Sequence, residues 1–239
     1  LIAGDNIVVG CWVTDNQQLG NPSGVLRAYD AITGQFSWAW DMGNPGYNGL
    51  PDEGGEYTRG TPNVWSNTSY DPQLNLVYAP TGNSSPDYFD GDLRSKEAEE
   101  NASSIVAIDA ATGQRRWVYQ TVHRDIWDYD VPSQPVLVNI RKNGEGELIP
   151  AVAGPTKRGE IYDTPEKPVP QNPAKGEVVT ATQPFSPLPH FRDDRIEQDM
   201  WGLTPLDQLH CRIEFKKMRY DGHFTPPMEG GGGYGLAEE

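Results

Sequence analysis

This 239-residue sequence has no long apolar run, and it has few cysteines and few basic residues. Each of these shortages excludes a kind of segment, site or partner. No stretch of about 18 consecutive apolar residues occurs, which excludes a helix of membrane-spanning length within it. The only cysteines, Cys11 and Cys211, lack the Cys-x-x-Cys or His spacing of a metal or redox motif. Lys and Arg number 19 against 34 Asp and Glu, a formal net charge of -15. Because a nucleic-acid backbone is bound through Lys and Arg, we expect no nucleic-acid partner.

An initiator methionine and a signal peptide are also missing. The sequence starts at Leu1, just before an apolar segment at about 6–13 that predicts a strand. We therefore expect an internal fragment or a processed product of a longer protein.

Glycine and proline are frequent, with 26 and 21 residues, and they favour many short strands joined by turns. One unit occurs twice, at 24–38 and 104–117: an apolar run, an Asp-x-x-Thr-Gly turn and a short strand that ends in Trp. The matching residues are Asp30, Gly34 and Trp38 in the first copy and Asp109, Gly113 and Trp117 in the second. Each copy predicts a β-hairpin whose Gly takes a positive φ. Repeated hairpins are typical of a β-propeller, so we expect an all-β fold built from propeller blades.

Residues 1–162 are expected to hold two to three of these blades. The predicted strands lie at about 6–13, 24–30, 36–40, 63–66, 74–79, 104–108, 116–120, 134–139, 148–153 and 159–162. An insertion at 83–101 ends in an acidic run, from Ser95 to Asn101, that is typical of a helix. A closed propeller needs at least about four blades, so the remaining blades should come from sequence outside this chain.

The rest of the chain is expected to differ in character. Residues 163–200 are Pro-rich and predict an irregular surface excursion, and 201–239 predict a further propeller strand and a frayed Gly-rich end. Basic and apolar side chains are interleaved near the end of the chain: Arg212, Ile213, Phe215, Lys216, Lys217 and Arg219. This interleaving indicates period-2 alternation, which predicts an edge strand with one solvated face.

Reactive side chains are densest directly after the last strand of the second blade. Residues 121–130 bring three carboxylates, His123 and an arginine together beside aromatic residues. Such a group suits a carboxylate general base near a metal, although Asp residues that cap loops and a Trp packed between blades would give the same pattern. Trp65 could offer its indole face to a flat cofactor or fill the core. Asn83 could offer an oxygen to Ca²⁺ or form an ordinary turn, and Lys157 could be a site cation or be solvated.

Several long motifs surround these residues. They are 119–135, Pro62-Asn-Val-Trp65, Ala102-Ser-Ser-Ile-Val-Ala, Gly154-Pro-Thr-Lys157, Leu203-Thr-Pro-Leu-Asp-Gln-Leu and Cys211-Arg-Ile-Glu-Phe-Lys-Lys-Met-Arg-Tyr. Together they resemble the membrane-bound quinoprotein dehydrogenases of the glucose and quinate type, over about 4–162 and 200–228. The resemblance implies an eight-bladed β-propeller that binds pyrroloquinoline quinone (PQQ) with Ca²⁺ or Mg²⁺.

The resemblance also implies a role for each candidate residue. It makes Asp128 the catalytic base, Lys157 the cation beside the quinone carbonyls, Trp65 the aromatic floor of the cofactor, and His123 and Asp125 close neighbours of the cofactor. Asn83 matches the Thr-Gly-Asn calcium ligand of the related quinoprotein alcohol dehydrogenases, which implies a metal ligand at this position. The implied reaction is the oxidation of a sugar or polyol hydroxyl in the periplasm. Electrons would pass to membrane ubiquinone, and a membrane anchor absent from this chain would attach the enzyme to the inner membrane.

Two features set limits on this interpretation. The strand and turn that the family places after Gly159-Glu-Ile-Tyr162 are missing from 163–200, and without the remaining blades the chain alone is expected to be inactive. Two other classes of protein remain open. A non-catalytic propeller scaffold would share the repeated turns but has no reason to keep the 121–130 cluster with Trp65 and Lys157. A carbohydrate-binding propeller is suggested by Asn-x-Ser/Thr sequons at Asn67, Asn83 and Asn101.

Overall fold

A computed structural model describes residues 1–14, 20–88, 93–141, 146, 149–152, 156–157, 160–161, 165–173, 176–185 and 196–226 of the chain. The chain divides into two compact units, Leu1–Thr164 and Pro165–Glu239. Each unit is described by itself below.

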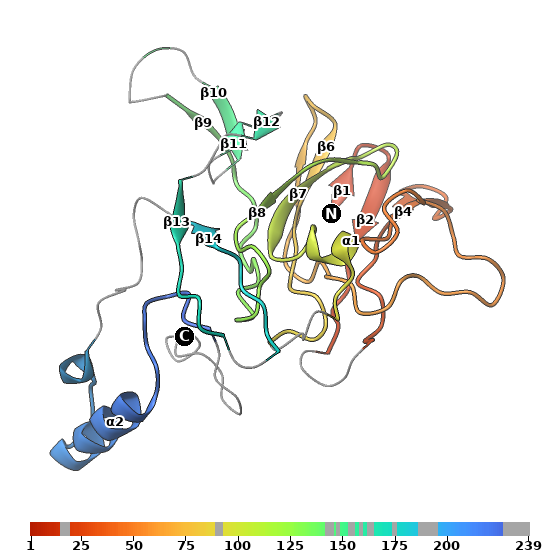
Figure 1. Ribbon diagram of the computed structural model, residues 1–239. Helices are drawn as coiled ribbons and strands as arrows, with labels where there is room; N and C mark the ends of the chain where they lie inside the picture. The colour runs from red at the N-terminus through yellow and green to blue at the C-terminus, as the bar shows by residue number, and fades with distance from the viewer. Residues whose placement is uncertain are drawn as a thin grey trace. The chain divides into compact units, whose positions relative to one another are not determined.

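Three four-stranded antiparallel sheets form the first unit, and in each the strands neighbour one another in chain order (Figure 1). The first sheet is β1 (Ile2–Ala3), β2 (Asn6–Val9), β3 (Leu26–Asp30) and β4 (Phe36–Trp40). The second is β5 (Ser69–Asp71), β6 (Leu76–Pro80), β7 (Ser104–Asp109) and β8 (Arg115–Gln120). The third is β9 (Leu137–Ile140), β10 (Ile149–Val152), β11 (Thr156–Lys157) and β12 (Glu160–Ile161). A meander of four antiparallel strands is the blade of a β-propeller, so the predicted all-β fold is confirmed.

Both faces of the second sheet are buried. Alternate residues of β6 and β7 (Val77, Ala79, Val106 and Ile108) join a core cluster with Leu26, Ala28, Trp38 and Trp40 of the first sheet. The intervening residues (Leu76, Tyr78, Ile105 and Ala107) pack on the opposite face with Val152 and Leu137 of the third sheet. Since side chains alternate between the two faces of a strand, this sheet lies between its two neighbours like a propeller blade.

The two repeated turns have the predicted conformation. In the first, Asp30 Oδ1 accepts hydrogen bonds from the backbone N–H groups of Ile32 and Thr33, at 3.0 and 2.6 Å. Asp109 Oδ1 accepts the same pair of bonds in the second turn, both at 3.0 Å. Gly34 and Gly113 have φ values of 70° and 73°, a region that glycine enters without steric cost. Both hairpins are therefore confirmed.

The Trp of the first repeat connects two blades. Trp38 is buried, and its Nε1–H donates to the carbonyl oxygen of Ala110 at 2.9 Å. Its ring also lies against Gly113, where an added Cβ would come within 2.6 Å of the indole. Trp38 of the first repeat thus packs against Gly113 of the second, and this contact joins the first blade to the second.

The insertion between β6 and β7 ends in a short helix, as its acidic run predicts. α1 spans Lys96–Glu99, and the side chain of Ser95 caps it by accepting from the backbone N–H of Ala98. Of the helices in the described ranges, none has the length and apolar character needed to cross a bilayer.

The second unit contains the short paired strands β13 (Glu166–Pro168) and β14 (Thr182–Pro184), the 3₁₀ turn η2 (Glu197–Asp199) and the helix α2 (Pro205–Lys217). The edge strand predicted from the basic residues after 211 is therefore wrong. Thr204 and Asp207 form a capping box in which each side chain accepts from the other's backbone N–H, and Pro205 occupies the first helical position. These start signals lie N-terminal to the alternating residues, and they outweigh the apparent period of two.

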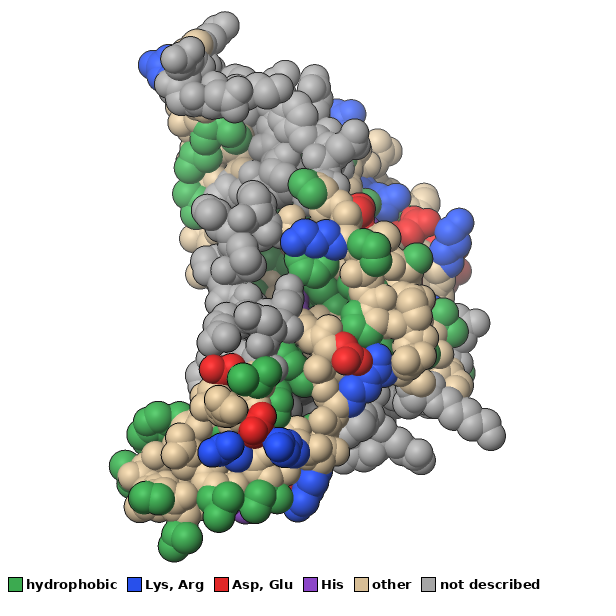
Figure 2. Space-filling view, turned by 60° about the vertical axis from the view of Figure 1, so that its left-hand side comes forward, with side chains coloured by type: hydrophobic (Ala, Val, Ile, Leu, Met, Phe, Trp, Pro, Cys, Tyr) green, Lys and Arg blue, Asp and Glu red, His purple; other side chains and the backbone are tan. Residues whose placement is uncertain are grey.

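The surface of α2 is mixed in character. Hydrophobic side chains lie beside Lys and Arg side chains on this helix (Figure 2). Leu206, Leu209 and Ile213 are exposed, and Phe215 is buried, with its ring 5.7 Å from that of Tyr220. Cys11 of the first unit and Cys211 of α2 are both free thiols.

Candidate active site

The loop that follows β8 carries most of the predicted site residues. Residues 121–132 form no regular ladder, yet the side chains of Val122, Asp125, Ile126 and Trp127 are buried within it. A loop with buried side chains needs partners for its backbone polar groups, and here a carboxylate supplies several of them.

Asp125 organises this loop from inside. Its carboxylate is fully buried and accepts hydrogen bonds from the hydroxyl of Ser103 and from the backbone N–H groups of Trp127 and Tyr129, the latter two at 2.9 and 2.8 Å. Burial raises the pKa of Asp125 from 3.8 to about 6, and the bonds from Ser103 and Trp127 oppose the rise only in part. Asp125 therefore fixes the course of residues 125–129.

Asp128 lies between the two N–H groups that Asp125 holds. Its φ is 65°, in the left-handed region that few residues other than glycine, Asn and Asp adopt. The rings of its neighbours Trp127 and Tyr129 stack, with centroids 5.8 Å apart and an interplanar angle of 13°. The backbone turns sharply at Asp128, and its half-buried side chain lies at this turn.

Asp130 joins the loop to two other predicted residues. Its Oδ2 accepts from Nε1–H of Trp65, and its Oδ1 accepts from the backbone N–H of Asn83, both at 2.6 Å. Two residues of chain span at most about 7 Å, so Asp128 is brought close to both Trp65 and Asn83. Hydrogen bonds thus link Trp65 and Asn83 to the loop that carries Asp125 and Asp128.

Trp65 lines a cleft of about 550 Å³ at the ends of the first two sheets. Its indole is 42% exposed, in contrast to the buried Trp38 and Trp40. The walls of the cleft come from Leu1, Val8 and residues 10–12, from residues 64–68 before β5, and from Gln134. A half-exposed aromatic ring beside polar groups is a surface suited to a planar polar ligand.

Asn83 is almost fully buried, and its amide is held in one orientation. The Nδ2 group donates to the carbonyl oxygens of Asp87 and Asp125, at 2.7 and 3.0 Å. Its Oδ1 accepts from the backbone N–H of Ser84 at 2.8 Å and keeps a second lone pair. One oxygen lone pair therefore remains for a hard cation.

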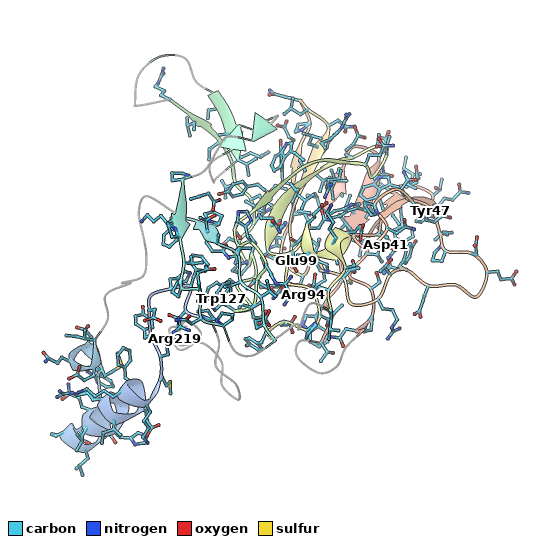
Figure 3. The ribbon with its side chains drawn as sticks, viewed as in Figure 1. Asp41, Tyr47, Arg94, Glu99, Trp127 and Arg219 are labelled. Carbon is cyan, nitrogen blue, oxygen red and sulfur yellow. The ribbon has the colours of Figure 1, made fainter. Side chains whose placement is uncertain are left out.

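A buried arginine ties the insertion at 83–101 to the same loop. Arg94 donates to the carbonyl oxygens of Pro86, Asp87 and Asp125, and it pairs with Glu99 at 3.3 Å. Arg94 lies close to Glu99, the last residue of α1 (Figure 3). The side chain of Arg94 is 1% exposed, and its hydrogen bonds hold residues 86–87 of the insertion against Asp125.

Two predicted residues have less defined positions. His123 lies after β8, with Nδ1 3.0 Å from Oε1 of Gln120. The backbone of Lys157 lies in β11, paired with β10 and β12, and its side chain lies outside the described residues. Roles for both remain predictions. Within the described ranges no three His, Cys, Asp or Glu side chains form a group that could hold a metal.

Sequence reasoning assigned no role to Asp130, Ser103 or Arg94. Asp130 was visible as one of three carboxylates in the 121–130 cluster, but nothing local indicates a bond to a tryptophan 65 positions earlier. Ser103 lies in the motif Ala102-Ser-Ser-Ile-Val-Ala and Arg94 in no motif, and neither position indicates a contact with Asp125, which lies 22 and 31 positions later.

Comparison with known proteins identifies the family. Residues 1–233 match the model of the PQQ family, described as the β-propeller domain of glucose/ethanol/alcohol dehydrogenases. The chain is 45% identical to the quinoprotein glucose dehydrogenase of Escherichia coli (strain K12), over 97% of this chain and 30% of that protein. It is 45% identical to the glycerol dehydrogenase large subunit of Gluconobacter oxydans (strain 621H), over 92% of this chain and 31% of that protein. It is 44% identical to the quinate/shikimate dehydrogenase (quinone) of Acinetobacter baylyi, over 95% of this chain and 29% of that protein.

A solved structure supports the fold. The quinohemoprotein alcohol dehydrogenase of Comamonas testosteroni superposes with a TM-score of 0.50 and 24% identity, covering 76% of this chain and 29% of that one. The chain spans about 30% of the length of the curated relatives it matches. With a family model matched over 1–233 and blade-like sheets in the structure, the chain belongs to the PQQ-type β-propeller family of glucose, ethanol and alcohol dehydrogenases.

Proposed function

We propose that the protein carrying this chain oxidises a hydroxyl group of a sugar or polyol with PQQ as its bound cofactor. The observation that carries the proposal is the link from Trp65, on the cleft, through Asp130 to the loop of Asp128. The relatives named above are a glucose, a glycerol and a quinate/shikimate dehydrogenase, whose named substrates all carry several hydroxyl groups.

The residues present fit a planar quinone. The cleft of about 550 Å³ lies within the range of small-molecule sites, and the exposed face of Trp65 offers a flat apolar surface. Ser66, Thr68 and Gln134 add hydrogen-bonding groups to its wall. No Lys or Arg side chain lines the described cleft, so we assign to Lys157 the positive charge beside the quinone carbonyls.

We assign the divalent metal, Ca²⁺ or Mg²⁺, to the neighbourhood of Asn83. Its Oδ1 retains one lone pair, and the Asp130 carboxylate bonded to its backbone N–H places negative charge nearby. Oxygen ligands of this kind suit hard divalent cations.

Asp128 is assigned the role of general base. Its carboxylate would take the proton of the substrate hydroxyl, while the buried Asp125 holds the loop in place. Asp125 has a pKa of about 6, but its two oxygens are engaged by Ser103, Trp127 and Tyr129, so it suits a supporting role. PQQ, when bound, supplies the two-electron acceptor of the oxidation. A cation at Lys157 and the metal would stabilise negative charge that develops on oxygen.

The proposal extends to the whole enzyme. We propose that electrons pass to membrane ubiquinone, that the enzyme works on the periplasmic side of the inner membrane, and that a membrane anchor and further propeller blades complete it. The quinate/shikimate relative carries the word quinone in its name, which supports a quinone acceptor.

Substitution of the base tests this function. In the whole protein, loaded with PQQ and Ca²⁺ or Mg²⁺, Asp128→Asn should lower turnover of glucose or another polyol at least about a hundredfold and leave PQQ affinity unchanged. Asp52→Asn is the matched control, because Asp52 is an exposed carboxylate on the loop after β4. Near-normal turnover by Asp128→Asn would show that another residue is the general base. If the unmodified protein does not bind PQQ, the proposed function is refuted.

A further inference from the structure

We propose that Asp130 is a positioning residue that fixes the indole of Trp65 against the cleft. The inference rests on the proposed function, in which Trp65 is the floor of the cofactor site. Asp130 accepts a hydrogen bond from Trp65, in addition to placing negative charge near the metal assigned to Asn83.

The indole needs such a support. Trp65 lies on a segment without a strand ladder, and its ring is 42% exposed. A half-exposed Trp side chain can change its two side-chain torsions, and each change would alter the surface that the cleft presents. The bond from Nε1–H to Asp130 Oδ2, at 2.6 Å, has a charged acceptor and is therefore stronger than a neutral bond.

Asp130 is itself held firmly. Its Oδ1 accepts from the backbone N–H of Asn83, and the next residue, Val131, donates its N–H to the carbonyl of Thr81. The carboxylate also lies against Gly82, where an added Cβ would be 2.7 Å from Asn63 Oδ1 and 2.9 Å from Asp130 Oδ2. Residues 130–131 thus run along the turn at 81–83, and this backbone contact fixes the acceptor for Trp65.

Two acceptors are needed on one side chain. Each oxygen of Asp130 accepts from an N–H donor, Oδ2 from the indole of Trp65 and Oδ1 from the backbone of Asn83. An asparagine has the same shape but only one acceptor oxygen, so its NH₂ group would face one of these donors. Asp130→Asn is therefore the variant that breaks the arrangement with the least change in volume.

The position of Trp65 can be measured without cofactor. With 5-fluorotryptophan in the whole protein, the ¹⁹F signal missing from Trp65→Phe identifies Trp65. We expect Asp130→Asn to shift or broaden this signal and leave the signals of Trp38 and Trp40 in place. Gly82→Ala should move the same signal without changing any charge, because its Cβ would meet both the Asp130 carboxylate and Asn63, and it serves if Asp130→Asn does not fold. Asp52→Asn should move none. An unchanged Trp65 signal in Asp130→Asn and Gly82→Ala overturns the proposal.

Cofactor affinity provides the second readout. We expect Asp130→Asn to weaken PQQ binding about tenfold, the scale of one charge-assisted bond. In a double-mutant cycle, the same substitution should cost much less in the Trp65→Phe background, because the indole N–H is already gone. Equal costs in both backgrounds overturn the proposal. If the unmodified protein binds no PQQ, the proposed function fails, and the ¹⁹F signals still decide whether Asp130 positions Trp65.

Discussion

At the scale of single residues, the site depends on carboxylates that accept hydrogen bonds from backbone N–H groups. Asp125 uses both oxygens inside the protein, on Ser103, Trp127 and Tyr129, and so determines the geometry at Asp128. An internal carboxylate of this kind contributes to catalysis through the shape of the loop. Its replacement should therefore affect folding and turnover together.

We expect Asp125→Asn to destabilise the whole protein by about 1–3 kcal/mol, because an amide places an NH₂ group against one of three donors in a buried site. Ser103→Ala removes only one of these donors and should cost less. Unfolding by urea, monitored by tryptophan fluorescence, measures both. A smaller effect for Asp125→Asn than for Ser103→Ala would contradict the proposed order of importance.

At the scale of elements, the repeated hairpins connect blades as well as strands. Gly113 has a φ of 73° and lies against Trp38, whereas Gly34 has a φ of 70° with no atom within 4 Å of an added Cβ. The two glycines thus share one backbone conformation, but only Gly113 packs against a residue of another blade. This difference allows the cost of backbone strain to be separated from the cost of blade packing.

Gly34→Ala should cost about 1–2 kcal/mol from the left-handed backbone alone. Gly113→Ala should cost about 1–3 kcal/mol more, because its Cβ would come within 2.6 Å of the Trp38 ring and force the blades apart. Thermal unfolding of the two variants gives the comparison. Equal losses would show that Trp38 does not press on the second hairpin in solution.

The turn carboxylates also predict a dependence on pH. Partial burial raises the pKa of Asp109, but hydrogen bonds from Arg116, Thr112 and Ala111 outweigh it and leave the pKa below its ordinary value of 3.8. A lowered folded-state pKa stabilises the fold above the unfolded value, and this stabilisation is lost as the pH falls below about 4. The free energy of unfolding, measured from pH 7 to pH 3, should fall less steeply in Asp109→Asn. An unchanged slope would contradict this role of Asp109.

At the scale of the whole molecule, the sequence predicted those turns, strands and helices that depend on residues close together in the chain. The Asp-x-x-Thr-Gly turns, the strands β3, β4, β7 and β8 and the capped helix α1 follow from alternation, turn residues and an N-cap. The helix α2 was missed because interleaved basic and apolar residues outweighed the capping box at Thr204 and Asp207. Short amphipathic segments are ambiguous between helix and strand, and their start signals should decide.

The site was predictable as a set of residues but not as a geometry. Trp65 and Asp128 stand out because they belong to the motifs at 62–65 and 119–135, and Asn83 stands out because it follows a predicted strand. Their connection through Asp130 depends on how the segment before β5 lies beside the loop after β8. These two segments flank the first and last strands of one four-stranded sheet, so their contact forms only when that sheet is assembled, and no local pattern encodes it.

In the proposed function, this chain supplies the floor of a PQQ site. A crystal structure of the whole protein with PQQ and Ca²⁺ tests it most directly. We predict that the planar cofactor stacks on the indole of Trp65, with the Asp130 bond intact and the Asp128 carboxylate facing the substrate space. A cofactor bound away from Trp65, or an Asp128 side chain that points away from it, would contradict the account.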